Sequence, residues 1–206
     1  PPTQRQKQYV LVIVDYFTRW VEIFPLRSTT SSDIATILID EIVCRWGCPT
    51  YILSDNGPQF VSELFTEICA SLGIATKTTS NYHPQTNLTE RVNRNLKPMI
   101  AQYAQENPQS WDKHLSKLAL SLRTSVNETT GETPAFLNFG RDPKLPIDLL
   151  LADPYQHPPS LPASHSVEIE QYKQRLRDDL STAHRIANEH NEIRKLQQKN
   201  RYDQHT

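Results

Sequence analysis

Two carboxylates are spaced so that they could bind a metal ion together. Asp55 ends the apolar run at 51–54 and precedes the turn sequence "NGP". Glu90 follows 35 positions later (90 − 55), near the expected start of a helix. Carboxylates stay ionised at neutral pH and are the hard oxygen ligands that Mg²⁺ prefers. Two Mg²⁺ or Mn²⁺ ions about 4 Å apart can activate an attacking oxygen and stabilise a leaving oxygen in phosphodiester chemistry.

Each carboxylate also has a structural interpretation, and the residues alone leave both interpretations open. An Asp in the sequence "SDNG" commonly opens a turn by hydrogen-bonding its own backbone. Glu90 lies three positions after Asn87, so the two could form a capping box at a helix start. Arg94 and Lys97 follow Glu90 at helical spacing. That spacing fits a solvated helix face, and it equally fits two cations that grip phosphates beside a metal.

A sheet and several helices must position these residues, and the sequence predicts them. The apolar, β-branched run at 9–15 indicates a buried strand, and the run at 20–26 indicates a second strand that completes a hairpin. A helix is expected at 31–46, ended by Gly47, and another at 61–73, with Leu64 and Phe65 facing inward. The remaining expected elements are strands at 51–54 and 74–80, a polar loop at 81–87 and a helix from Leu88.

This order of strands and helices predicts an α/β domain with a mixed sheet at residues 1–150. Pro and Ser cluster at 153–164, so we expect a linker over 151–166. From 167 to 206, apolar residues recur every three or four positions, which predicts a long amphipathic helix. The apolar stripe of this helix needs a partner, either the core of the same chain or another subunit.

Composition sets broad limits on the function. The 206 residues carry a formal net charge of −1, which neither demands nor excludes nucleic acid because local charge decides binding. No apolar run reaches the length of a membrane span. Three Cys without a disulfide pattern indicate a reducing compartment. We expect Cys44 and Cys48 to be core residues rather than zinc ligands, because no matching His or Cys pair follows.

Four motifs, taken in order, resemble the integrases of gypsy-type LTR retrotransposons in the retroviral integrase superfamily. They are "LVIVDYFTRWVEIFPL", "ILSDNGPQF", "LGIATKTTSNYHPQTNLTERVNRNLK" and "TGETPAFLNFGRDPKLP". The resemblance runs from about residue 8 to 150 and implies an RNase H-like fold, a mixed sheet flanked by helices. It also implies an Asp…Asp…Glu metal site that joins the 3′ ends of element DNA to target DNA. On that implication Asp55 and Glu90 are the second and third catalytic acids and ligands of Mg²⁺ or Mn²⁺.

The resemblance further implies that the first acid lies outside this sequence. In the family, that Asp sits on the strand before the "VIVD" strand, and "PPTQRQKQYVLVIVD" resembles what comes just after it. We therefore expect the first strand and its Asp to precede Pro1, and Asp15 to have a turn or hydrogen-bonding role. With two of its three acids, the chain by itself is expected not to integrate DNA. The helix at 167–206 would lead to a C-terminal domain that is also outside the sequence.

Several polar residues near Glu90 are candidates for binding nucleic acid. They are Arg94, Lys97, Asn93 and His83, although His83 in a polar loop has the plainer interpretation of an ordinary surface residue. The expected partners are retroelement ends, target DNA and further copies of the chain, in the nucleus and without a membrane. An alternative function stays open: a non-catalytic, domesticated integrase-like module that binds DNA or protein.

Overall fold

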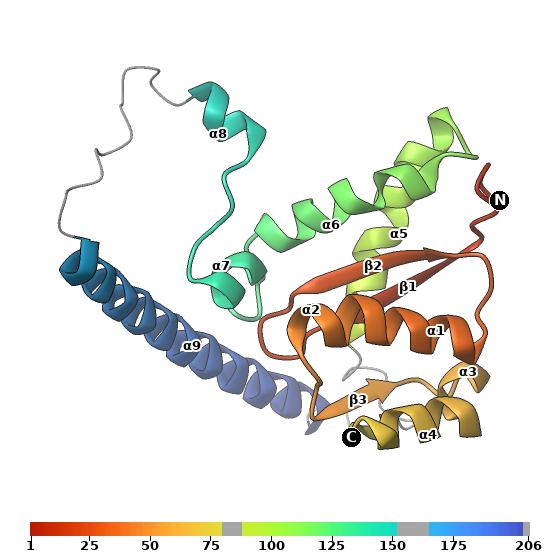
Figure 1. The fold of residues 1–206 in the computed structure, drawn as a ribbon, viewed down its shortest axis with the longest axis horizontal. Coiled ribbons are helices and arrows are strands. Elements are labelled where there is room, and N and C mark those ends of the chain that lie inside the picture. The colour runs from red at the N-terminus through yellow and green to blue at the C-terminus, as the bar shows by residue number, and fades with distance from the viewer. Residues whose placement is uncertain (80–87, 152–164, 204–206) are drawn as a thin grey trace. The chain divides into compact units, whose positions relative to one another are not determined.

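The computed structural model describes residues 1–79, 88–151 and 165–203 (Figure 1). Two compact units emerge, one built from Pro1–Val14 and Glu22–Ala119, the other from Asp15–Val21 and Leu120–Thr206. The expected loop at 81–87 and most of the expected linker lie outside the described residues. The domain boundaries at 150 and 166 therefore stay a prediction.

In the part of the chain that the structure describes, four strands pair into two sheets of two strands each. They are β1 (Tyr9–Val14), β2 (Val21–Leu26), β3 (Tyr51–Ser54) and β4 (Ala75–Thr78). β1 pairs with β2 as the expected hairpin, and β3 pairs with β4 in parallel, with Tyr51 opposite Ala75 and Ser54 opposite Thr78. A parallel pair needs a crossover between its strands, and helices fill that role here.

The helical segments described in the first unit include the helices expected at 31–46, at 61–73 and from Leu88. They are α1 (Ser31–Ile37), the π-helical segment η1 (Leu38–Val43), α2 (Cys44–Trp46), α3 (Pro58–Val61), α4 (Glu63–Ser71), α5 (Leu88–Glu106), the 3₁₀ segment η3 (Trp111–His114) and the first half of α6 (Leu115–Thr124). The Thr30 hydroxyl caps α1 by accepting a hydrogen bond from the Asp33 amide. Gly47, at φ 88°, ends the run after α2 in a conformation that favours glycine.

One hydrophobic cluster joins both pairs of strands to α1 and α4. Its buried members are Leu11, Leu26, Ile34, Ala35, Leu38, Phe65, Cys69 and Ile74. α1 packs against α4, and α5 packs against β1, behind the hairpin in Figure 1. Within the described residues no strand bridges the two sheets. Their spacing is therefore set by the packing of this shared core rather than by hydrogen bonds between them.

The prediction that Leu64 faces inward is wrong, because its side chain is 49% exposed. The Ser62 hydroxyl caps α4 by accepting a hydrogen bond from the Phe65 amide, and this sets where the helix begins. Phe65 and Cys69 then point into the core, four residues apart on one face. Leu64 lies about 100° around the helix from Phe65 and so falls on the outer face.

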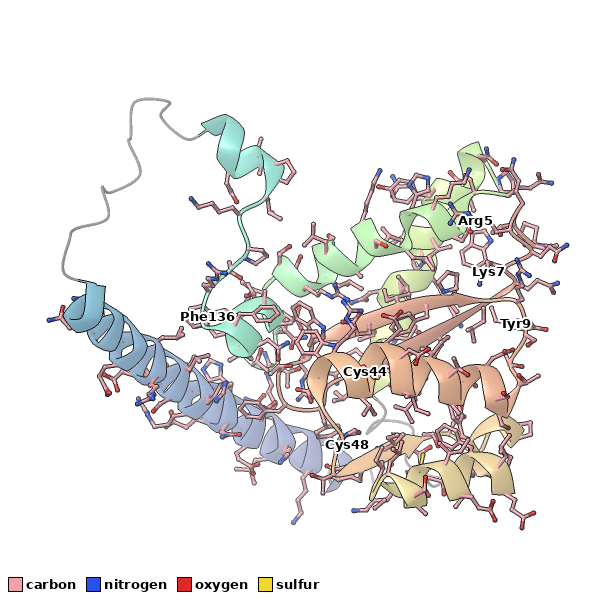
Figure 2. All side chains as sticks on the ribbon, viewed as in Figure 1. Arg5, Lys7, Tyr9, Cys44, Cys48 and Phe136 are labelled. Carbon is pink, nitrogen blue, oxygen red and sulfur yellow. The ribbon has the colours of Figure 1, made fainter. Side chains whose placement is uncertain are left out.

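The interpretation of Cys44 and Cys48 as core residues is also wrong. Both thiols are exposed, at the end of the helical run and its Gly47 turn (Figure 2). A turn at a helix end lies at the surface because its backbone groups need water as a partner. Cys69 is the buried cysteine, and this burial raises the pKa of its thiol.

The second unit is built around the long helix that the sequence predicts. It contains the loop at 15–21, the end of α6, α7 (Pro134–Phe139), α8 (Pro146–Leu151) and α9 (His165–Asp203). Ala183 and Ala187 of α9 are buried against Leu137 of α7, and His184 Nε2 lies 2.9 Å from the Leu137 carbonyl oxygen. The Arg19 guanidinium donates to Asn191 Oδ1 at 2.7 Å. The part of the apolar stripe of α9 around Ala183 and Ala187 thus finds a partner within its own chain, whereas Ile193 is 52% exposed.

The burial of α5 against β1 can be tested with a matched pair of leucines. Leu96 of α5 is 2% exposed and Leu64 of α4 is 49% exposed. We expect Leu96→Ala to lower the free energy of unfolding by about 2–5 kcal/mol, because it leaves a cavity in the core. Leu64→Ala, the control, should change it by less than about 1 kcal/mol. Urea denaturation measures both, and equal losses would contradict the packing described.

Candidate active site

Asp55 lies directly after β3, and its side chain is exposed. Its Oδ1 accepts a hydrogen bond from the Gly57 amide at 3.0 Å. This is the turn contact that the structural interpretation of Asp55 expects. Within the described residues, however, the hydrogen bonds of the Asp55 carboxylate involve Oδ1 and leave Oδ2 for another ligand. The turn and metal interpretations of Asp55 are therefore compatible, since the turn holds the carboxylate in place at the end of the strand.

Gly57 is a positioning residue that the sequence marked only as part of a turn. A Cβ atom at this position would lie 2.9 Å from Asp55 Oδ1 and 2.5 Å from Gln59 Nε2. Both distances are shorter than ordinary van der Waals contact, so any larger residue would displace these side chains. The signal in the sequence was the "DNG" run, because glycine often marks a close approach to the backbone.

The parallel register brings the ends of β3 and β4 to the same edge of their sheet. There the Thr79 amide donates to the Ser54 carbonyl oxygen at 2.8 Å, directly beside Asp55. The chain then runs through 80–87, outside the described residues, and enters α5 at Leu88. The segment that leads to Glu90 therefore starts next to Asp55. The convergence of the two carboxylates on one cation stays a prediction.

The first turns of α5 carry the remaining candidates. Glu90 lies in the first turn of the helix, and Glu90, Arg94 and Lys97 are all exposed. Their spacing places them on one face, whereas Leu96 is buried about 120° away. Asn93 is half-buried at the border of that face. His83, and Asn87 of the alternative capping box, lie outside the described residues.

Asp15 has the turn role expected for it. Its Oδ2 accepts hydrogen bonds from the Thr18 amide and the Thr18 hydroxyl, both at 2.7 Å. Its backbone amide donates to the Trp20 carbonyl oxygen and so closes the β1–β2 connection. Asp15 therefore orders the turn between β1 and β2 through its Oδ2 atom.

The carboxylate oxygens of Asp55 and Glu90 suit a divalent cation, but two side chains form only part of a metal site. Among residues 1–79, 88–151 and 165–203, no three or more His, Cys, Asp or Glu side chains are grouped to hold a metal. Asp55 and Glu90 offer the carboxylate oxygens that Mg²⁺ and Mn²⁺ prefer. None of the helices in the described residues is long and apolar enough to cross a membrane.

This arrangement of strands and helices is that of an RNase H-like fold, and comparison with known proteins agrees. Residues 1–84 match the integrase core domain family. The chain is also similar to a solved structure of the HTLV-2 integrase catalytic core domain in complex with magnesium, in a trimeric form. That likeness has a TM-score of 0.51 and 27% sequence identity, and covers 61% of this chain and 81% of the other. The RNase H-like fold is thereby confirmed.

Two relatives show which integrases the chain is similar to. The Gag-Pol polyprotein of Avian reticuloendotheliosis virus is 36% identical over 137 residues, which are 66% of this chain and 12% of the polyprotein. The Gypsy retrotransposon integrase-like protein 1 of Homo sapiens is 28% identical over 144 residues, 70% of this chain and 27% of that protein. The chain thus spans only a minor part of either relative. The resemblance to integrases of retroviruses and gypsy-type elements is confirmed.

The close approach at Gly57 can be tested by substitution. Gly57→Ala should displace the Asp55 carboxylate and the Gln59 side chain, because the added methyl group overlaps both, while stability should change by less than about 1 kcal/mol because both side chains can move. Amide NMR signals of residues 55–59 are expected to shift, while those of β1 and β2 stay in place. Unchanged signals at 55–59 would show that the turn is looser than described.

Proposed function

We propose that the chain is the catalytic core of an integrase that joins the 3′ ends of retroelement DNA to target DNA by metal-dependent polynucleotidyl transfer. The observation that carries this proposal is the Asp55 carboxylate, held by its hydrogen bond to the Gly57 amide at the edge from which the chain leads to Glu90. The integrase core match over residues 1–84 supports it. So does the likeness to a retroviral core solved with magnesium.

In this proposal Asp55 and Glu90 hold Mg²⁺ or Mn²⁺ through their carboxylate oxygens. When bound, such ions activate an attacking oxygen and stabilise the leaving oxygen of a phosphodiester. We further propose that the parent protein supplies the first of the three acids from a strand that precedes Pro1. Two acids alone would position the ion poorly, so residues 1–206 by themselves should not integrate DNA.

The exposed face of α5 would bind DNA beside the metal. Arg94 and Lys97 are exposed cations one turn and two turns beyond Glu90, with Asn93 at their border. His83, outside the described residues, stays a further candidate for DNA binding. Contacts of this kind address the phosphate backbone, so little sequence preference is expected. The trimeric form of the similar HTLV-2 core supports the proposal that copies of the chain associate. Action on chromosomal target DNA would place the protein in the nucleus.

The catalytic assignment is tested in a longer form of the protein that includes the upstream strand. Asp55→Asn and Glu90→Gln should each lower strand-transfer activity by at least about 10²-fold, because each removes a charge that stabilises the transition state. Glu63→Gln is the matched control, an exposed acid in the first turn of α4. Retained activity in Asp55→Asn would reject the assignment. An extended protein that binds DNA but neither binds Mn²⁺ nor transfers strands would support the non-catalytic alternative.

The role of the α5 face is tested through the salt dependence of DNA binding. Lys97→Ala should reduce the slope of log affinity against log salt concentration by about 0.9, the value for one lost phosphate contact. Lys117→Ala serves as the control, because Lys117 is an exposed lysine on α6. Fluorescence anisotropy with a labelled duplex measures the slopes. An unchanged slope for Lys97→Ala would show that DNA does not bind along this face of α5.

A further inference from the structure

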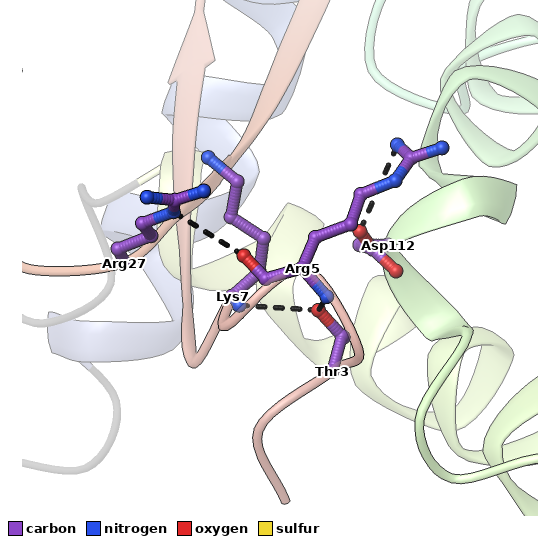
Figure 3. A network of polar contacts seen from close by, with 5 residues as sticks. All are labelled: Thr3, Arg5, Lys7, Arg27 and Asp112. Carbon is purple, nitrogen blue, oxygen red and sulfur yellow. Dashed lines mark hydrogen bonds and ion pairs between the residues drawn. The ribbon is translucent and has the colours of Figure 1, made fainter.

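Three cations gather at the open end of the β1–β2 hairpin, outside the site described above. Arg5 and Lys7 precede β1, and Arg27 follows β2 (Figure 3). The Arg27 Nε donates to the Arg5 carbonyl oxygen at 3.3 Å, which ties the end of one strand to the loop before the other. Arg5 and Arg27 are exposed and Lys7 is half-buried. Sequence reasoning passed over this cluster because it depends on the pairing of β1 with β2.

The loop that carries Arg5 and Lys7 is held in one conformation by its own hydrogen bonds. The buried Thr3 hydroxyl accepts from the Arg5 amide at 3.2 Å and from the Lys7 amide at 3.1 Å. The Thr3 amide donates to the Lys7 carbonyl oxygen at 2.9 Å. The loop is also fastened to the segment before α6, where the Trp111 indole donates to the Pro1 carbonyl oxygen at 3.1 Å. A loop fixed in this way presents its cations with little further loss of entropy on binding.

Acidic neighbours engage only part of this positive charge. Arg5 NH1 lies 3.9 Å from Asp112 Oδ2, and the Asp112 side chain is 1% exposed. Asp33, exposed in the first turn of α1, accepts a hydrogen bond from Ser28, and this contact lowers the pKa of its carboxyl group; the positive charge of Lys7 lowers it further, so Lys7 lies within electrostatic reach of Asp33. Within the described residues, neither Lys7 nor Arg27 forms an ion pair. An anionic partner could therefore contact both cations without breaking a salt bridge, although Asp33 attracts Lys7 at longer range.

The cluster lies at the same end of the first unit as Asp55. Arg27 is followed four residues later by α1, and the Ser31 side chain at the start of α1 lies 2.7 Å from the Ser62 hydroxyl. Ser62 directly follows α3, the short helix that begins after the Asp55 turn. Figure 1 shows the same arrangement, with the start of β1 and the end of β3 on one side of the unit.

We propose that Lys7 and Arg27, with Arg5 beside them, form a second phosphate-binding site that receives the backbone of duplex DNA. The choice of DNA as the partner rests on the proposed function. Lys7 offers a compact charge, and the guanidinium of Arg27 can donate two parallel hydrogen bonds to one phosphate. DNA held at the Asp55 edge would continue along this end of the unit and meet these cations. The site extends the path of the DNA without taking part in the chemistry.

The test measures binding of a labelled DNA duplex to the 206-residue chain by fluorescence anisotropy, in EDTA and at salt concentrations of roughly 50–200 mM. Lys7→Ala and Arg27→Ala should each lower the affinity and reduce the log–log salt slope by about 0.9. Arg45→Ala is the control, because Arg45 pairs with Glu41 at the far end of the helical run. Its neighbour Cys44 lies at the opposite side of the unit from Lys7 in Figure 2. Arg5 is left unchanged, since its removal would also strip Asp112 of its ion-pair partner.

The outcomes separate this proposal from the proposed function. Slopes for Lys7→Ala and Arg27→Ala that equal the slope for Arg45→Ala would overturn the second site, whatever the Asp55 and Glu90 variants do. The same holds if the unaltered chain fails to bind the duplex. EDTA removes divalent metal, so reduced slopes for the two variants support the site even if Asp55→Asn retains strand transfer and the catalytic assignment fails.

Discussion

The parallel pairing of β3 with β4 is the constraint on which the candidate site depends. It places the ends of two strands at one edge, with Asp55 after the first and the segment that leads to α5 after the second. A parallel pair exists only because α3 and α4 cross between its strands, and α4 can cross there because Phe65 and Cys69 are buried in the shared core. The burial of Phe65 and Cys69 in the core thus helps to determine where the Asp55 carboxylate lies at the edge of the sheet.

Local hydrogen bonds then fix the orientation of the side chains and loops next to these strand ends. The Asp55 carboxylate is oriented by the Gly57 amide, and the loop at residues 3–7 is held by the Thr3 hydroxyl. Each contact joins residues that are close in sequence, and each forms next to the end of a strand, where backbone donors would otherwise lack partners. Together they present an acid and a set of cations at the same end of the unit. Such an arrangement suits a ligand that carries both a metal-binding phosphate and a continuing anionic backbone.

The net charge of −1 for the whole chain gives no sign of the positive charge at the open end of the β1–β2 hairpin. Many exposed cations are matched by acids on the same helix, as in the pair of Arg45 with Glu41 and that of Arg185 with Glu189. Exposed pairs of this type contribute little stability and form a solvated surface. The cations at the open end of the hairpin differ because folding brings them together from both sides of β1 and β2. Local charge rather than total charge therefore decides whether such a surface can bind nucleic acid.

The sequence by itself determined the elements, their order and the resemblance to integrases. β-branched runs, helical spacing and capping residues act over a few positions, so the strands, α4 and the starts of α5 and α9 could be predicted within a residue or two. Only the tertiary structure decided that Leu64 faces outward, that Cys44 and Cys48 are exposed, and that Arg5 and Asp112 lie 3.9 Å apart although 107 positions separate them (112 − 5). These features depend on how each element is rotated and packed against distant ones, and periodicity within one element carries no information about that.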